Sequence, residues 1–405
     1  MPLPRRHLWA GIGAGSSALV AMGGCVTILN LDGLSSGDAG VADSARDVTR
    51  ARDGGSRDAG SREAARGSEG GKDGAADGRP CQGAACPDAG PPATSCAGAG
   101  GAGLTDCPAG SGQESCCVSL DVEGGTYYRS YQAGTAALGV CAGGVACDGG
   151  TEKGNPATVS SFRLDKYLVT VGRFRRFREA FMQEEGIPAA GAGRHTHLNG
   201  GSGLANSGSA AGYEPGWLQT WNSSVDPTDA NLECGPDATP PLSTWTPTIG
   251  TNESLPMGCA NWWEAYAFCI WDGAFLPSEA EWEYAAAGGS DQRPFPWGAT
   301  DPGMSQLFAV YGNSSITEPV GSAPEGAARW GQLDMAGDAY EWVLDYFAPY
   351  VDPCADCADL GSEFNRSLRT QHYGTGTEYL APPYRSASSP FGRNFSIGFR
   401  CARVP

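Results

Sequence analysis

Apolar side chains recur at helical spacing in a short segment near the middle of the chain. Asn261 stands directly before this segment, where a polar residue caps the first turn of a helix, and Gly273 stands where the helix would end. The apolar face would consist of Trp262, Ala265, Tyr266, Cys269 and Ile270. The pattern therefore predicts a short helix with a tryptophan-rich buried side.

A second helix is predicted directly after the first. Ser278 and Glu281 have the spacing of a capping box, in which each side chain accepts a hydrogen bond from the other residue's backbone N–H. Trp282 begins the apolar face, and two consecutive glycines at residues 288–289 supply the stop signal. The two helices would be separated by only a short turn.

The other apolar positions form short alternating runs. Glycine, proline and asparagine interrupt these runs, and glycine alone accounts for 61 of the 405 residues. Such a pattern predicts short strands joined by turns. Ten of the eleven tryptophans lie between Trp217 and Trp342, so we expect the core to be built there. The predicted fold class is α+β with much irregular structure.

The N-terminal region has the pattern of an export signal. Two arginines precede an apolar run from Leu8 to Ala21, which is too short to span a membrane. The sequence Met-Gly-Gly-Cys at residues 22–25 resembles a bacterial lipobox, so residues 1–25 are expected to be a signal peptide. Either Cys25 is lipidated and tethers the exported protein to the outer membrane or cell surface, or cleavage near Gly23 leaves it in the periplasm.

A long polar segment separates this signal from the rest of the chain. Residues 35–95 contain no leucine, isoleucine, methionine or aromatic residue. Such a segment cannot bury enough apolar surface to offset the entropy lost on ordering, so residues 26–95 are predicted to be a disordered linker. The folded domain would then be residues 96–405, with a cysteine-rich lead-in at residues 96–150.

Charge and cysteine content narrow the choice of partners and compartment. The net charge of −18 argues against nucleic acid or an anionic membrane surface as a partner. Fifteen cysteines favour an oxidising compartment. Without Cys25 there are eight between residues 81 and 147 and six between residues 234 and 401, so each group could be fully paired. Cys354 and Cys357 could form a disulfide or a redox or metal pair, and export favours the disulfide.

The segment from Leu255 to Gly289 resembles the tryptophan-rich signature block of the formylglycine-generating enzyme, or sulfatase-modifying factor, family. Three further stretches resemble other blocks of this family in the same order, namely residues 161–174, 319–342 and 397–403. The resemblance covers roughly Cys116 to Pro405. It implies a fold related to C-type lectins, with little regular secondary structure and with stabilisation by disulfides, aromatic side chains and bound calcium.

The resemblance also implies specific links within this chain. It implies a disulfide between Cys269 in the first predicted helix and Cys401 near the C-terminus, which would contribute about 4 kcal/mol in the chain-entropy model. It implies a structural calcium site in which Asp338 and Glu341 supply hard oxygen ligands. The alternative for Glu341 is an ion pair or a capping role within the core.

Active members of this family oxidise a cysteine of a sulfatase peptide with molecular oxygen and Cu(I), which two cysteine thiolates hold. The two thiolates, separated by four residues, precede the C-terminal block, but residues 359–400 of this chain contain no cysteine. When Arg385 is aligned with the family's arginine, His372 and Thr377 occupy or approach the two positions. An imidazole and a hydroxyl cannot replace two soft thiolates, so we expect neither copper nor oxidase chemistry.

Histidines offer a different metal site. His195 and His197 would lie on one side of an extended segment, and His372 could be a third ligand. Nothing in the sequence brings the three together. We therefore interpret His372 as a polar residue that lines the ancestral cleft.

Two functions remain open. The first is a surface-tethered, disulfide- and calcium-stabilised module that binds a peptide or small molecule in a cleft near His372, Thr377 and Arg385, without oxidase chemistry. The second is an enzyme, either a formylglycine-generating oxidase or a related metal-dependent oxidase with atypical ligands. In both, the membrane would be contacted through a lipid anchor alone.

Overall fold

The computed structural model describes residues 93–98, 100–109, 112–129, 131, 153–208, 211–235, 243–312, 316–361 and 364–405. All of them belong to one unit, Pro80–Pro405. The predicted signal peptide, Cys25 and the predicted linker up to residue 92 lie outside the described residues. Within the described part, no helix combines the length and the apolar character needed to cross a membrane.

Four α-helices lie in the described part of the chain. α3 (Trp262–Trp271) begins at Asn261 and α4 (Glu279–Ala286) begins at Ser278, and each start is a complete capping box. The two helices predicted from apolar spacing are thus confirmed. α1 (Val171–Phe181) and α2 (Asp229–Leu232) each begin after a threonine whose hydroxyl accepts a backbone hydrogen bond. Short 3-10 turns occur at Thr94–Cys96, Asn199–Gly201, Gln219–Ser224, Gly289–Asp291, Pro324–Gly326 and Thr377–Tyr379.

The largest described sheet has four strands in the order β12-β11-β8-β13. Their bounds are β8 Tyr340–Tyr346, β11 Arg366–Arg369, β12 Arg385–Ser388 and β13 Ile397–Gly398. β11 runs antiparallel to both of its neighbours, and Leu368 lies opposite Trp342 of β8. β13 runs parallel to β8, so a C-terminal segment completes this sheet.

Smaller sheets join the two ends of the domain. β6 (Phe162–Asp165) lies between β3 (Ser119–Val122) and the C-terminal β14 (Ala402–Arg403), antiparallel to both. β5 (Pro156–Val159) lies between β4 (Gly125–Tyr128) and β9 (Cys354–Ala355). Two further pairs are β1 (Cys107–Ala109) with β2 (Gly112–Glu114), and β7 (Ala205–Asn206) with β10 (Cys357–Ala358). The class is α+β, as predicted.

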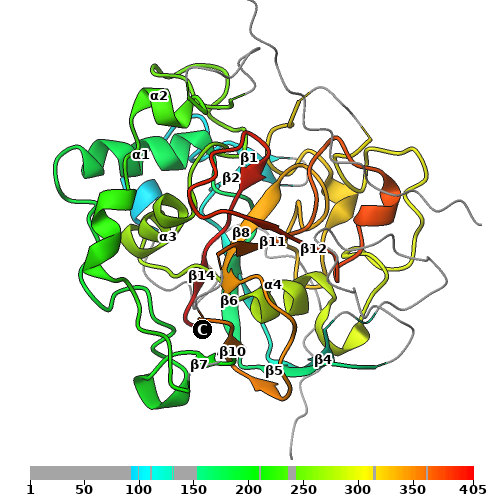
Figure 1. Cartoon of the computed structure of the whole chain (residues 1–405). Helices are drawn as coiled ribbons and strands as arrows, with labels where there is room; N and C mark the ends of the chain where they lie inside the picture. The colour runs from blue at the N-terminus through cyan, green and yellow to red at the C-terminus, as the bar shows by residue number, and fades with distance from the viewer. Residues whose placement is uncertain are drawn as a thin grey trace, which may run out of the picture. The chain divides into compact units, whose positions relative to one another are not determined.

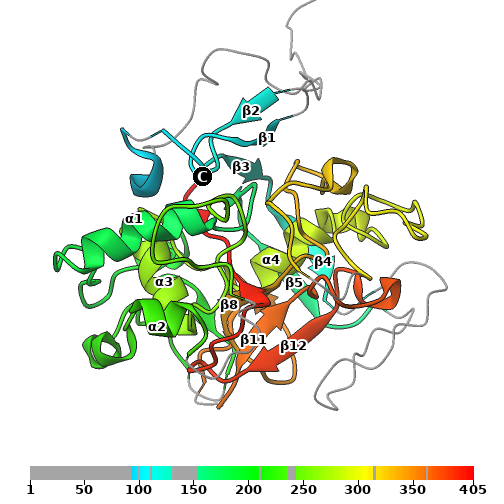
Figure 2. The ribbon, with the colours of Figure 1, turned by 90° about the horizontal axis from the view of Figure 1, so that it is seen from above.

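Large aromatic side chains make up the core. Trp217, Trp262 and Trp342 are fully buried in one cluster, which also contains Phe268 of α3. Trp282 of α4 is fully buried in a second cluster. α1 lies beside α3, and α4 packs on β8 and β11, as Figure 1 and Figure 2 show. The tryptophan-rich segment therefore forms much of the core, and α1 and the C-terminal strands complete it.

Five disulfides join cysteines in the described part of the chain. Cys269 of α3 is bonded to Cys401, with an S–S distance of 2.04 Å across 132 residues, and this is the pair that the family resemblance implies. Cys354 and Cys357 are bonded to each other. The other three are Cys96–Cys117, Cys107–Cys116 and Cys234–Cys259. All six cysteines between residues 234 and 401 are thus paired, as their even number predicts.

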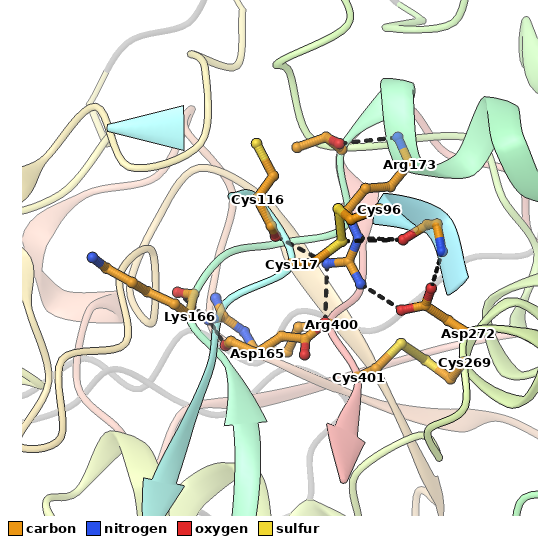
Figure 3. Close-up of polar contacts among 12 residues, drawn as sticks. Cys96, Cys116, Cys117, Asp165, Lys166, Arg173, Cys269, Asp272, Arg400 and Cys401 are labelled. Atoms are coloured by element: carbon orange, nitrogen blue, oxygen red, sulfur yellow. Dashed lines mark hydrogen bonds and ion pairs between the residues drawn. A yellow bond between two sulfur atoms is a disulfide. The ribbon is translucent and has the colours of Figure 1, made fainter. Parts of the chain in front are cut away.

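A buried cluster of ion pairs lies beside the Cys269–Cys401 bond (Figure 3). Arg173 of α1 is fully buried and contacts Asp165 at 3.0 Å and Asp272 at 2.7 Å. Arg403 of β14 contacts the same two carboxylates, at 3.3 and 2.6 Å. Burial alone would raise the pKa of Asp272, but the two arginines outweigh burial and hold this pKa below its usual value. The cluster therefore ties α1, the end of α3, β6 and β14 together.

Removal of Arg173 is expected to destabilise the domain strongly. In Arg173→Met, two buried carboxylates keep only Arg403 as a counter-charge, so the free energy of unfolding should fall by about 3–5 kcal/mol. Arg176→Met is the matched control, because Arg176 lies on the same helix with an exposed side chain. It should change stability by less than about 0.5 kcal/mol. Urea unfolding measures both values, and equal stability of the two variants would contradict the role given to Arg173.

Candidate functional site

A groove of about 380 Å³ lies beside Tyr373, which follows the end of β11. Its other walls come from residues 243–255, residues 316–319 and Phe395. The lining mixes aromatic and aliphatic side chains with threonine, serine and asparagine, and Glu318 supplies a negative charge. Such a mixture of apolar surface and a few polar groups suits a peptide or a small organic ligand.

Two hydrogen bonds tie the turn that carries Tyr373 to a second turn. Thr370 follows β11 with a φ of +53°, and its hydroxyl accepts a hydrogen bond from the Gly337 N–H at 3.1 Å. The Tyr373 N–H donates to the Asp338 carbonyl oxygen at 3.1 Å. Gly337 has a φ of +79°, and a Cβ there would lie 2.3 Å from the carbonyl oxygen of Val310, so this position requires glycine. The two turns hold one wall of the groove in place.

His372 and Thr377 lie outside the described lining of this groove. The ring of His372 lies between those of Tyr340 and Tyr373, with centroid distances of 5.3 and 5.2 Å. Its Nδ1 accepts a hydrogen bond from the Gly374 N–H at 3.2 Å, and burial lowers the pKa of His372. Thr377 begins a 3-10 turn. The sequence analysis singled out none of the residues that line the groove, and the sequence signal for Tyr373 is its position next to His372.

Arg385, the third predicted cleft residue, is buried in β12. Its guanidinium pairs with Glu279 of α4 at 2.7 Å and donates to the Ala348 carbonyl oxygen at 2.8 Å. It borders a small cavity of about 10 Å³, which has room for about one water molecule. The structure thus places Arg385 in a structural ion pair and not at an open cleft, because the buried Glu279 carboxylate needs a counter-charge.

Glu279 binds a second arginine as well. Arg369 of β11 pairs with Glu279 at 2.8 Å and with Glu283 at 3.2 Å. Burial would raise the pKa of Glu279, but Arg385 and Arg369 outweigh burial and lower this pKa. These contacts clamp α4 onto β11 and β12, the two strands that flank the Tyr373 turn. A site supported in this way keeps its geometry without help from a ligand.

Asp338 is buried behind the part of the groove wall formed by Thr317 and Glu318. Its Oδ1 accepts hydrogen bonds from the Thr317 hydroxyl and from the Glu318 N–H, the latter at 3.0 Å. Its Oδ2 is buried and has no hydrogen-bond partner among the described residues. Burial, with the nearby Asp334 carboxylate, raises the pKa of Asp338 to about 8. A cation would stabilise such an unsatisfied carboxylate.

Glu341, the other predicted calcium ligand, forms an ion pair with Arg400. Both of its oxygens accept hydrogen bonds from Arg400, Oε2 at 2.7 Å and Oε1 at 2.9 Å. This arrangement is the ion-pair alternative for Glu341, and it leaves Asp338 as the remaining candidate calcium ligand. The part of the chain that the structure describes contains no group of three or more histidine, cysteine, aspartate or glutamate residues placed to hold a metal ion.

Residues 113–405 match the model of the sulfatase-modifying factor enzyme 1-like domain family. The chain belongs to this family. The match extends over most of the chain, and it confirms the resemblance seen in the four sequence blocks.

Named relatives of this sulfatase-modifying factor-like domain match smaller parts of it. Hercynine oxygenase from Mycobacterium tuberculosis is 31% identical over 157 residues, which cover 36% of this chain and 36% of that protein. Formylglycine-generating enzyme from the same organism is 32% identical over 166 residues, which cover 35% of this chain and 55% of that protein. The chain thus spans about a third to about a half of the length of these relatives.

Solved structures resemble the domain at lower identity. PvdO from Pseudomonas aeruginosa is 20% identical, with a TM-score of 0.46, over 76% of this chain and 100% of its own. Treponema denticola variable protein 1 is 18% identical, with a TM-score of 0.44, over 71% of this chain and 95% of its own.

His195 of the sulfatase-modifying factor-like domain is bound by two carboxylates. Its Nδ1 lies 2.9 Å from Glu214 and its Nε2 lies 3.1 Å from Glu281. Burial would lower the pKa of His195, but the two carboxylates outweigh burial and raise it to about 10. An imidazolium donates from both nitrogens and has no lone pair for a metal. The geometry therefore does not support a site built from His195, His197 and His372.

The ion pairs of His195 are expected to stabilise the domain in a defined pH window. The pKa of His195 is raised from 6.5 to about 10, so its contribution is complete below about pH 6.5 and is lost as the pH rises to about 10. Burial would raise the pKa of Glu281, but His195 outweighs burial and lowers it, so this contribution is lost as the pH falls below about 4.5. Unfolding free energies of the wild type and His195→Gln should therefore differ most between about pH 4.5 and 6.5.

His372→Gln is the matched control for this pH dependence. Burial lowers the pKa of His372, so the contribution of its neutral ring is present above about pH 6.5 and is lost as the pH falls. The two variants should thus show opposite trends in urea titrations across this range. If the difference between the wild type and His195→Gln stayed constant up to about pH 10, His195 would not be charged in the folded state.

Proposed function

We propose that this domain is a binding module that takes a peptide or a small molecule in the groove beside Tyr373 and lacks the oxidase chemistry of the family. The proposal rests on the lack of free cysteine thiols in the segment of the chain around Tyr373. Residues 359–400 contain no cysteine, and Cys354 and Cys357 are bonded to each other. The described lining of the groove offers hydroxyl, amide and carboxylate groups.

These donors do not fit copper. Cu(I) prefers soft thiolate and thioether ligands, whereas hydroxyl and carboxylate oxygens are hard ligands. His372 adds one imidazole beside the groove, and its Nδ1 already accepts a hydrogen bond from the Gly374 N–H. One imidazole with hydroxyl groups does not reproduce a pair of thiolates.

An oxidase with atypical ligands is the second candidate. Two relatives, named formylglycine-generating enzyme and hercynine oxygenase, favour it. The matched segments cover 55% and 36% of those proteins, so parts of both lie outside the match. Since one fold can carry different activities, the chemistry of the site decides between the two candidates.

A peptide of the form Cys-x-Pro-x-Arg tests binding and chemistry in one experiment. We expect the domain to bind the peptide but not to convert its cysteine to formylglycine, even with Cu(I) supplied, because the site offers no pair of soft ligands. The arginine of the peptide would complement Glu318, and Tyr373 would supply contact area. Tyr373→Ala should therefore weaken binding about tenfold in calorimetry, and mass spectrometry should detect no aldehyde.

Two controls accompany this experiment. Tyr213→Ala should leave binding unchanged, because Tyr213 is exposed and lies outside the described lining. The formylglycine-generating enzyme from Mycobacterium tuberculosis is the positive control for conversion. Aldehyde formation by the domain itself would overturn the proposal, and loss of that activity in Cys357→Ser would assign the metal site to Cys354 and Cys357.

We also propose that Asp338 holds a structural calcium ion. Its buried Oδ2 lacks a partner, and its raised pKa indicates a carboxylate without sufficient positive charge nearby. Calcium prefers hard oxygen ligands, including carboxylates and backbone carbonyls. In this proposal Glu341 stays paired with Arg400 and is not a ligand of the ion.

Chelation is expected to lower the melting temperature by about 5 °C, because an ion bound only to the native state stabilises it by mass action. Asp338→Asn should remove most of this response. Asp345→Asn is the matched control, because Asp345 is also buried but accepts two backbone N–H hydrogen bonds, at 2.7 and 2.8 Å. Calorimetry with and without EGTA provides the test. A melting temperature that does not change on chelation would exclude a structural calcium ion.

We propose further that the protein is exported and tethered through Cys25 to the outer membrane or cell surface, with the periplasm as the alternative. The five disulfides support an oxidising compartment. The net charge of −18 supports a membrane contact through the anchor alone and no nucleic-acid partner.

A further inference from the structure

A second pocket, of about 160 Å³, lies between α3, β8 and residues 214–221. It shares no lining residue with the groove beside Tyr373. Its walls are rich in aromatic side chains, among them Trp221, Trp262 and Tyr346. The volume is roughly ten times the minimum for one water molecule, and the aromatic lining suits an organic group.

Arg366 lines this pocket with its guanidinium between two aromatic rings. The central guanidinium carbon lies 3.6 Å from the ring centroid of Trp262 and 3.5 Å from that of Tyr346. Nη1 donates to the Leu344 carbonyl oxygen at 2.7 Å. Nε is buried without a partner, and Nη2 makes no hydrogen bond to a described residue. One edge of the guanidinium, formed by Nε and Nη2, is therefore unused.

Most of the buried arginines of the described chain have a carboxylate partner, whereas Arg366 has none within ion-pair distance among the described residues. Arg173, Arg369 and Arg400 each pair with a carboxylate at 2.7 or 2.8 Å. No described carboxylate lies within 4.0 Å of Arg366. Burial lowers the pKa of Arg366 to about 10, which means that its charge is poorly compensated.

The acidic groups near the pocket already have partners. Asp345 accepts two backbone N–H hydrogen bonds, at 2.7 and 2.8 Å. Asp359 accepts a hydrogen bond from the Gly361 N–H at 2.9 Å. Glu214, which lines the pocket, lies 2.9 Å from His195. None of these described carboxylates therefore serves as a counter-ion for Arg366.

We propose that this pocket binds an organic carboxylate, with the acid group on the Nε–Nη2 edge of Arg366 and an aromatic or aliphatic body against Trp221 and Trp262. A carboxylate matches this planar edge with two parallel hydrogen bonds. A bound carboxylate would accept a hydrogen bond from Nε, and its negative charge would balance the charge of the Arg366 guanidinium. Contacts between the ligand body and the aromatic walls add apolar burial. Free organic acids and the C-terminal carboxylate of a peptide share this chemistry.

The test uses phenylacetate and its uncharged analogue phenylacetamide. For phenylacetate we expect a Kd on the order of 1 mM by calorimetry, which is typical of a ligand of this size. The amide should bind at least about tenfold more weakly, because it lacks the charge that strengthens the paired hydrogen bonds. N-acetylglycyl-phenylalanine distinguishes a free organic acid from the C-terminal carboxylate of a peptide as the ligand. Binding tighter than that of phenylacetate indicates a peptide C-terminus, and weaker binding indicates a free acid.

Substitutions at the rim locate the binding site without disturbing the core. Leu218 lines the pocket and is 39% exposed, so Leu218→Glu should repel the acid and weaken its binding at least about tenfold. Leu307→Glu makes the same change at a leucine that is 54% exposed and outside the described lining, and it should have no effect. Arg366→Lys keeps a charge without the planar edge and should remove the preference for the acid over the amide.

Two results would refute this assignment. One is equal binding of phenylacetate and phenylacetamide, and the other is equal phenylacetate binding by the Leu218→Glu and Leu307→Glu variants. Near-UV circular dichroism verifies that the Arg366→Lys variant is folded. The assignment does not depend on the groove beside Tyr373 or on the absence of oxidase activity. The Cys-x-Pro-x-Arg experiment can therefore fail while this one succeeds, and the reverse also holds.

Discussion

The fold depends on the pairing of charged side chains that are buried in its interior. Arg173 and Arg403 share the carboxylates of Asp165 and Asp272. The Cys269–Cys401 bond lies beside Arg173 and Asp272 (Figure 3). Each of these charges alone would be strongly destabilising in a buried site, so the four are stable only as a set. They come from α1, the end of α3, β6 and β14. Their pairing therefore requires that β6 and α1 meet the C-terminal strand β14.

The same need to pair buried charges explains how α4 is held on β11 and β12. Glu279 of α4 holds Arg369 and Arg385, and this clamp fixes the two strands around the Tyr373 turn. Arg366 departs from this pattern, because it is buried between two rings and no carboxylate of the described residues lies within 4.0 Å of it. The carboxylate ligand proposed for its pocket would supply this missing counter-charge.

In the function proposed for this domain, the family scaffold is kept and the donor groups for copper oxidation are not. The capping boxes, the buried tryptophans and the Cys269–Cys401 bond all belong to the scaffold. The groove beside Tyr373 offers oxygen donors, and the cysteines nearest in sequence are used in a disulfide. Scaffold and chemistry are separable here, because packing depends on shape and burial whereas copper chemistry depends on two particular sulfur atoms.

The sequence by itself determined the local features and the family. Apolar spacing and capping residues specify α3 and α4, because these signals act within one or two helical turns. The motif blocks, read in order, specified the family and its long disulfide. Only the tertiary structure decided which polar residues are buried together. His195 became an ion-pair partner, Arg385 became part of a clamp, and Arg366 was placed with no carboxylate of the described part of the chain within ion-pair distance. Those outcomes depend on contacts between residues far apart in the chain, for which local periodicity carries no signal.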